Sequence, residues 1–323
     1  MEICDGFWIQ LILKLVVALV VILTGALVVI YAELKIGSHM QTRIGPYYAG
    51  GKWGWAQPLA DGLKFLQKED LAPDGADRTV YGFAPYVVLM STLAIFAVIP
   101  MGPDLVAADL DVGVYYVLAI SSISVLGVLM AGWSSANKYS LIGGLRAAGQ
   151  LIAYELPLVL AVVAVVIQAS TMSLSGIVEA QNQTLFTVGG FDVALPYVLQ
   201  GQIVSFAIFM IAAVAELSRI PFDMPIAESE LTMGYLTEYS GIRFTMFFLG
   251  EYASMVGLSA IAATLFLGGY SVPGLTGVSA NLGGPIVLLI KVALLVFVII
   301  WIRWTWPRLR EDQLQHLAWR WLI

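Results

Sequence analysis

Seven long apolar stretches constrain the fold of this chain more than any other feature. They lie at roughly residues 7–32, 83–103, 113–135, 147–170, 197–217, 244–268 and 284–304. A bilayer core about 30 Å thick is crossed by about 20 helical residues, so each stretch is long enough to span it. Of the 323 residues, 59% are hydrophobic and only 12% are charged. The sequence therefore predicts an all-α, polytopic membrane helix bundle that forms a single transmembrane domain over residues 1–323.

The positions of the basic residues predict the orientation of these spans. Fourteen of the 16 Lys and Arg residues lie on one side, and the other two, Lys14 and Lys291, lie within spans. Loops rich in Lys and Arg stay on the cytoplasmic side of a membrane. We therefore expect a multi-pass protein of the cell inner (plasma) membrane, with its N-terminus outside and its long loops 33–82 and 217–243 cytoplasmic. Loops of this length usually serve a function, so we expect a large partner to dock on them.

Three carboxylates are predicted at similar depths in the inner halves of three spans. Glu155 and Glu251 each lie about eight residues into a span, which is about 12 Å at 1.5 Å per residue. Glu216 lies near the inner end of a third span. Side chains at helix ends can reach the lipid headgroups, but a glutamate is short for that distance. We favour the alternative of a buried acidic cluster beside a wet cavity, because ionisable residues within spans are rare and usually functional.

The first inner loop contains an amphipathic segment. Leu59, Leu63 and Leu66 recur at helical spacing, and Pro58 suits a first helical turn. Such a segment lies in the plane of the membrane interface. Its apolar side either anchors the chain there or borders a lipid-soluble ligand, and physical chemistry alone favours the anchor.

The second inner segment, residues 215–252, is acidic and is interrupted by proline. Pro221 and Pro225 are predicted to end the fifth span as it leaves the membrane. The acidic residues after that span are Asp223, Glu228, Glu230 and Glu238. A solvated charged loop is one interpretation, but the spans on both sides favour a loop that a partner covers.

The sequence has no motif of its own for a redox cofactor. It has one cysteine, Cys4, and its two histidines, His39 and His316, lie outside the predicted spans. Bis-histidine haem ligation within the membrane is therefore excluded, and neither a Rossmann fingerprint nor a Walker A motif is found. A redox role would require cofactors on other chains.

Over nearly its whole length the chain resembles one family, the H-subunit family of respiratory complex I. Four groups of motifs carry the resemblance. Those of the first loop are Gln41, Arg43-Ile44-Gly45-Pro46, Gln57-Pro58, Asp61-Gly62, Lys64 and Lys68-Glu69. Those between and within the third and fourth spans are Gly132-Trp133, Asn137-Lys138-Tyr139, Gly143, Arg146, Gln150 and Tyr154-Glu155. Those of the acidic segment are Ala215-Glu216, Arg219, Pro221-Phe222-Asp223, Glu228-Ser229-Glu230-Leu231, Glu238-Tyr239 and Glu251-Tyr252, and those of the tail are Pro307-Arg308, Arg310 and Asp312-Gln313-Leu314. Each motif is weak alone, but together and in order they are specific.

The resemblance implies the membrane subunit of a proton-translocating NADH:quinone oxidoreductase. The residues implied to line or border its quinone chamber are Gln41, Arg43, Asp61, Lys64, Phe222 and Asp223. Those implied to form the start of its proton path are Glu155, Glu216, Arg219, Glu228, Glu230 and Glu251, with Arg219 pairing with the acids. The chain itself would hold no cofactor and no metal. Quinone, such as ubiquinone, would be the substrate, and NADH, FMN and iron–sulfur clusters would bind to partner subunits.

The implied partners are the peripheral-arm subunits that carry the terminal iron–sulfur cluster and the quinone headgroup site. The other implied partners are small membrane subunits that lead to the antiporter-like subunits, and the lipid bilayer. No nucleic acid is expected as a partner.

Three departures from the family pattern stand out. Leu34 replaces an arginine at the end of the first span, and Ile226 replaces an acid of the second inner segment. The family also continues past the tail with one more spanning helix, whereas this sequence ends at Ile323. Either that helix is absent or the polypeptide is shortened.

Two rival functions remain open from the sequence. The first is the homologous subunit of a membrane-bound hydrogenase or of a ferredoxin- or deazaflavin-dependent oxidoreductase, which the co-encoded peripheral subunits would distinguish. The second is a stand-alone transporter, which predicts inverted repeats and a midplane site. No internal repeat is evident, and the charge is concentrated at the inner face, so the transporter is disfavoured.

Overall fold

The computed structural model describes residues 2–103, 105–183, 186–188, 191–193, 195–271 and 278–323; the side chain of Lys14 lies outside the described part. Within these residues, the longer helices are α1 (Glu2–Met40), α2 (Gln57–Gln67), α3 (Arg78–Ile95), α4 (Gly113–Ser134), α5 (Lys138–Ala169), α7 (Ile203–Glu216), α9 (Gly241–Phe266) and α10 (Val278–Thr305). The shorter elements are η1 (Phe96–Val98), α6 (Leu174–Gln181), α8 (Glu228–Leu231), η2 (Gly234–Leu236), α11 (Glu311–Leu317), η3 (Ala318–Leu322) and the antiparallel strands β1 (Phe186–Val188) and β2 (Phe191–Val193).

The helical membrane bundle predicted from the sequence is confirmed. In the described part of the chain, six helices are long and apolar enough to cross a membrane, namely α1, α3, α4, α5, α9 and α10. The predicted span 197–217 is only partly helical, because α7 has 14 residues and is therefore about 21 Å long. The chain before it forms turns, in which Gly201 takes a φ of 103°, so α7 alone is shorter than a bilayer core.

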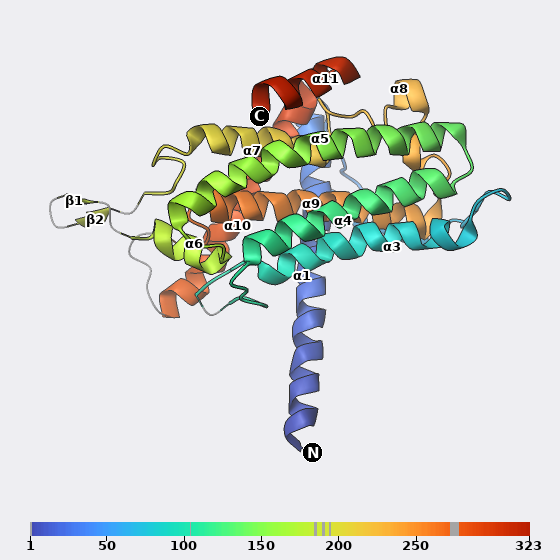
Figure 1. Ribbon diagram of the computed structural model, residues 1–323. Helices are drawn as coiled ribbons and strands as arrows, with labels where there is room; N and C mark the ends of the chain where they lie inside the picture. The colour runs from blue at the N-terminus through green and yellow to red at the C-terminus, as the bar shows by residue number, and fades with distance from the viewer. Residues whose placement is uncertain (1, 104, 184–185, 189–190, 194, 272–277) are drawn as a thin grey trace.

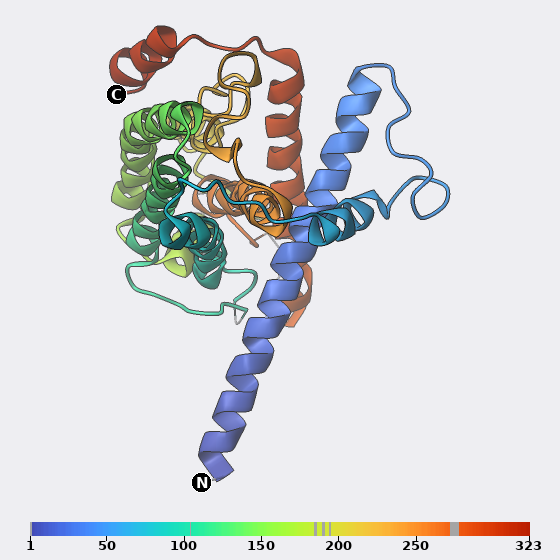
Figure 2. The same ribbon diagram turned by 90° about the vertical axis from the view of Figure 1, so that its right-hand side faces the viewer.

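The helices fall into two groups by direction. In Figure 1, α3, α4, α5 and α9 run side by side across the view, whereas α1 stands nearly upright behind them and its N-terminal half projects beyond the bundle. Figure 2 shows α1 and α10 as neighbours on one side of this layer. Helices α1, α9 and α10 all contact one another. Glu33 near the C-terminal end of α1 also contacts Arg219, which follows α7.

Small residues allow the helices of the layer to approach closely, as is typical in membranes. A Cβ added at Gly132 of α4 would lie 2.9 Å from the Cα of Gly144 on α5. Real Cβ atoms do not come so close to backbone, so the α4–α5 contact requires glycine at this point.

The predicted amphipathic segment of the first loop forms α2. Pro58 lies in its first turn and is buried, whereas Leu59, Leu63 and Leu66 are exposed. On its other side Phe65 packs against Phe244 of α9, with ring centroids 5.5 Å apart. The leucine stripe therefore faces away from the protein.

Candidate functional site

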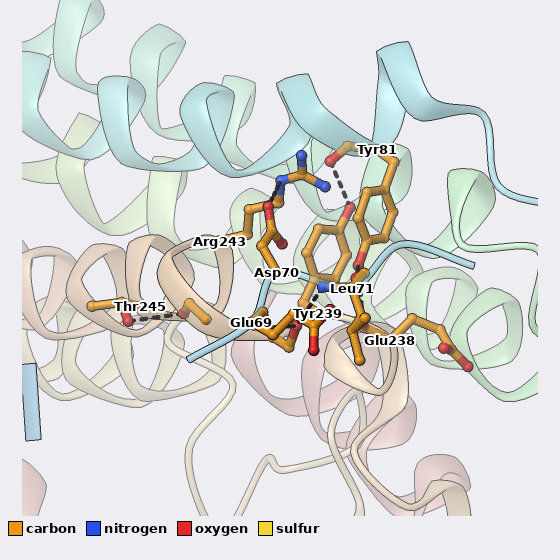
Figure 3. A network of polar contacts seen from close by, with 10 residues as sticks. Glu69, Asp70, Leu71, Tyr81, Glu238, Tyr239, Arg243 and Thr245 are labelled. Carbon is orange, nitrogen blue, oxygen red and sulfur yellow. Dashed lines mark hydrogen bonds and ion pairs between the residues drawn. The ribbon is translucent and has the colours of Figure 1, made fainter. Parts of the chain in front are cut away.

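The first inner loop is fastened to the beginning of α9 by the polar network drawn in Figure 3. The Ser240 hydroxyl donates to the carbonyl oxygen of Glu69 at 3.0 Å and accepts from the backbone N–H of Leu71 at 3.1 Å. Beside it, Arg243 Nε lies 3.1 Å from Asp70 Oδ2. These contacts hold the two inner segments together although they are about 170 residues apart in sequence.

The same network anchors the end of the acidic segment to α3. The rings of Tyr81 and Tyr239 are stacked with centroids 4.2 Å apart. Their hydroxyls donate in a crossed pattern, Tyr81 to the Glu238 carbonyl at 2.7 Å and Tyr239 to the Tyr81 carbonyl at 3.1 Å (Figure 3). Asn137, which caps α5, donates to the Glu238 carboxylate at 2.5 Å. The C-terminal end of residues 217–240 is thus fixed to α3 and to the beginning of α5.

A buried ion network lies where α1, α9, α10 and this loop meet. Arg219 Nη1 lies 2.6 Å from Glu33 Oε2, and Arg219 Nε lies 2.9 Å from Glu251 Oε1. Arg303 of α10 pairs with the second oxygen of Glu33. The side chains of Arg219 and Glu33 are only 2% and 5% exposed, and the Arg219 guanidinium also covers the ring of Tyr252, 4.6 Å from its centroid. The network therefore balances two carboxylates against two guanidiniums.

Glu33 and Arg303 are the residues of this network that are absent from the predicted proton path. The first apolar stretch ends at residue 32, which predicts Glu33 in the loop. The structure continues α1 to Met40, because neither proline nor glycine interrupts the chain between residue 32 and Gly37. The absence of a residue that stops a helix directly after position 32 is the sequence signal that indicates a longer helix including Glu33.

The three acids predicted within the spans come together near the inner end of α7. Glu216 and Glu251 line one cavity of about 60 Å³. Glu155 of α5 is close enough to Glu216 for their charges to repel each other. Since bulk water occupies about 30 Å³ per molecule, this cavity has room for about two waters. Ile226, where the family resemblance implies an acid, also lines it.

Gln150 and Tyr154 of α5 hold the loop that carries Phe222 and Asp223. The Gln150 amide donates to the carbonyl oxygens of Ala215 and Phe222 at 2.7 and 2.8 Å. The Phe222 ring is buried edge-on against Tyr154, with centroids 5.1 Å apart. Phe222 therefore packs inside the protein and is not on an open surface.

The acidic residues of α8 lie apart from the half-buried acids Glu155, Glu216 and Glu251. Glu230 is exposed and lies 2.7 Å from Arg146 Nη1 and 3.4 Å from Arg308 Nη1. The hydrogen bond from Arg146 and the charge of Arg308 lower the pKa of Glu230. Glu228 is also exposed and is close enough to Asp223 to interact with its charge. These two glutamates therefore lie at the surface of the protein.

Burial raises the pKa of Asp223 from 3.8 to about 6, although Arg308 and Arg303 oppose the shift. The folded state thus favours the neutral carboxyl more than the unfolded chain does. This contribution to stability is present at low pH and is lost as the pH rises through about 4 to 6.

Because the raised pKa of Asp223 makes the folded protein less stable as the pH rises, we predict an effect of Asp223→Asn that depends on pH. The variant should raise the thermal midpoint of the detergent-purified complex more at about pH 7.5 than at about pH 5. The amide remains neutral, so it avoids the cost of a half-buried charge above the pKa of Asp223. The midpoints of both variants at both pH values provide the measurement. An equal shift at the two pH values would contradict the assigned titration.

The remaining predicted residues lie on the first inner loop, and the structure does not bring them into the buried cluster. Gln41 and Arg43 follow α1 and are exposed, and Lys64 is exposed on α2. Asp61 is half-buried and accepts a hydrogen bond from Gln57 Nε2 at 3.0 Å. Among the described residues, no group of three or more His, Cys, Asp or Glu side chains is arranged to hold a metal ion.

Comparison with known proteins gives a consistent result. The family model described as NADH dehydrogenase matches residues 13–323. An NADH-quinone oxidoreductase H subunit of Syntrophobacter fumaroxidans, the one numbered 2, is 48% identical over 323 residues, covering 97% of this chain and 91% of the relative. "NADH-quinone oxidoreductase subunit 8" of Rhodothermus marinus is 42% identical, covering 98% and 93%. The NADH-quinone oxidoreductase H subunit of Dehalococcoides mccartyi is 42% identical, covering 99% and 84%.

Proposed function

The chain belongs to the NADH dehydrogenase family of NADH-quinone oxidoreductase H subunits, and from this premise we propose that it borders the quinone chamber of a proton-translocating enzyme and begins its proton path. The observation that carries the proposal is the convergence of Glu216 and Glu251 on one small cavity. Buried carboxyls are costly within a membrane and are retained where protons or ions move.

The ion network gives this site an electrostatic connection to the loop. Glu251 borders the cavity and is also bonded to Arg219, which follows α7 at the beginning of the loop. A change of charge or position in that loop would act on Glu251 through the guanidinium. Quinone reduction consumes two protons, and its charge change beside the loop would thereby shift the protonation of the acids. This is the coupling that we propose.

The chamber itself would lie on the inner face, between the loop of Phe222 and Asp223 and the first inner loop with Gln41, Arg43, Asp61 and Lys64. The network of Figure 3 supports this assignment, because it fixes the two segments against each other. The exposed leucine stripe of α2 would lie at the membrane interface, beside the route of a lipid-soluble quinone.

The other subunits of the oxidoreductase are the partners of this multi-pass protein. We propose that peripheral subunits with the terminal iron–sulfur cluster and the quinone headgroup site dock on the inner face, and that small membrane subunits receive the protons. NADH, FMN and the clusters would bind to the peripheral subunits. The fourteen basic residues on one side support a cytoplasmic position for that face and an N-terminus outside the inner membrane.

The chamber assignment predicts that Glu228→Gln lowers quinone reduction and proton pumping together in membranes that contain the assembled complex. Glu228 is exposed beside Asp223, so its loss changes the charge at the chamber without disturbing the core. The two rates are measured on the same membranes. Glu179→Gln, an exposed glutamate of α6 that forms none of the ion pairs found among the described residues, is the control and should leave both unchanged. Unchanged rates in Glu228→Gln would make α8 a docking surface only.

A further inference from the structure

The cavity of about 60 Å³ that Glu216 and Glu251 line is also lined by a serine, Ser254, that the proposed proton path does not use. Ser254 lies three residues after Glu251 on α9, so both side chains project from the same face of that helix. Glu216 reaches the cavity from the end of α7. The serine hydroxyl is therefore placed within the same small space as both carboxyls.

A second hydroxyl holds Ser254 from the opposite helix. The hydroxyl oxygens of Ser254 and Thr92 are 3.0 Å apart, and either one can be the donor. Thr92 belongs to α3 and is only 2% exposed, and its hydroxyl also lies 2.9 Å from the carbonyl oxygen of Val88. When Thr92 donates to Val88, Ser254 donates to Thr92 and presents lone pairs to the cavity. When Thr92 donates to Ser254, the serine proton is free to point into the cavity.

The cavity is lined by two other serines, Ser124 and Ser218, and among the described hydrogen bonds neither pairs its hydroxyl with another hydroxyl across the helices. Ser124 of α4 also lines the cavity, but its hydroxyl donates to the carbonyl oxygen of Ser121 at 2.7 Å. Ser259 lies on α9 and is buried, yet it is not among the residues that line the cavity. The reversible hydroxyl pair thus distinguishes Ser254 from its neighbours.

We propose that Ser254 is a proton-relay residue between Glu216 and Glu251, and that Thr92 is the positioning residue that keeps it available in both orientations. In one transfer, the protonated carboxyl of one glutamate gives its proton, directly or through a cavity water, to Ser254 Oγ. Ser254 passes its own proton to the carboxylate of the other glutamate. The hydroxyl is unchanged at the end, and its bond to Thr92 reverses to reset it. The proposal rests on the proposed function, since it requires that both acids exchange protons.

The test uses membranes that contain the whole complex and compares four variants with the parent protein. Ser254→Ala and Thr92→Val remove one hydroxyl each, Thr92→Ser retains it, and Ser259→Ala removes a buried hydroxyl of α9 that lies outside the cavity. Quinone reduction, proton pumping and the solvent deuterium isotope effect on turnover are measured on each. Glu216→Gln is measured beside them as the test of the path itself.

We expect Ser254→Ala to lower turnover and pumping about tenfold, because water replaces a positioned relay group only in part. Its solvent isotope effect should rise, since proton transfer then limits the rate. Thr92→Val should show the same changes to a smaller degree, while Thr92→Ser and Ser259→Ala should match the parent. A merely structural role would change stability without changing the isotope effect.

Two outcomes overturn the inference in distinguishable ways. Normal turnover and isotope effect in Ser254→Ala, with Glu216→Gln inactive, would keep the path and reject the serine relay. Normal behaviour of both variants would reject the proposed path as well.

Discussion

Replacing Arg219 by leucine is expected to destabilise the subunit by about 3–5 kcal/mol, the usual result of removing one member of a buried ion pair. The side chain is 2% exposed and neutralises Glu33 and Glu251 at 2.6 and 2.9 Å. Without it, buried Glu33 retains Arg303 alone, and half-buried Glu251 loses its ion-pair partner. We therefore expect little assembled complex in the membrane, measured by native gel and by the thermal midpoint of what is recovered.

Two further variants make this prediction specific. Arg219→Lys keeps the charge, but one ammonium group does not reproduce the fork that reaches both acids, so an intermediate loss is expected. Arg310→Ala removes an exposed guanidinium that pairs with Asp312 and should leave assembly unchanged. Normal assembly of Arg219→Leu would mean that the network contributes little to stability.

The largest effect on activity is expected from Glu216→Gln. Glutamine has nearly the same shape but does not exchange a proton, and loss of a positioned acid–base group costs about 100-fold or more in rate. Glu216 belongs to none of the ion pairs found among the described residues, so this change leaves the Arg219 network intact. Quinone reduction and proton pumping, assayed on the same membranes, should both fall.

The controls for this variant separate chemistry from folding. Glu179→Gln on α6 changes an exposed glutamate far along the chain from the acids and should behave like the parent. The thermal midpoint of Glu216→Gln should not fall, because no pairing is lost. Full quinone reduction and full pumping in an assembled Glu216→Gln complex would show that protons bypass this cavity.

Much of the fold could be predicted, because hydrophobicity over about 20 residues is a local property of the chain. The prediction was inaccurate where a conformation depends on neighbouring segments. The stretch 197–217 is apolar throughout, yet only Ile203–Glu216 is helical. Helix α1 continues past residue 32 to Met40, and only the packed structure shows that Glu33 pairs there with Arg219 and Arg303.

The family could also be identified from motifs, and the comparisons confirm it. The roles of individual residues follow less directly. Glu230 and Glu251 both belong to motifs of the family, but the structure places Glu230 in surface ion pairs and half-buried Glu251 at the cavity shared with Glu216. Sequence spacing gives the position of a residue along its own helix. It does not show which side chain of a neighbouring helix that residue contacts.

The sequence by itself determined that this chain is a membrane helix bundle with acids within its spans, because composition and hydrophobic length fix the solvent in which each segment is stable. Only the tertiary structure decided which charges meet. Arg219, Glu33 and Arg303 come from widely separated positions, and Ser254 meets Thr92 across two helices. Such pairings depend on how the helices cross and on where small residues such as Gly132 allow them to approach closely. Helix crossing and close approach are properties of the packed protein, so they cannot be read from any one segment of the sequence.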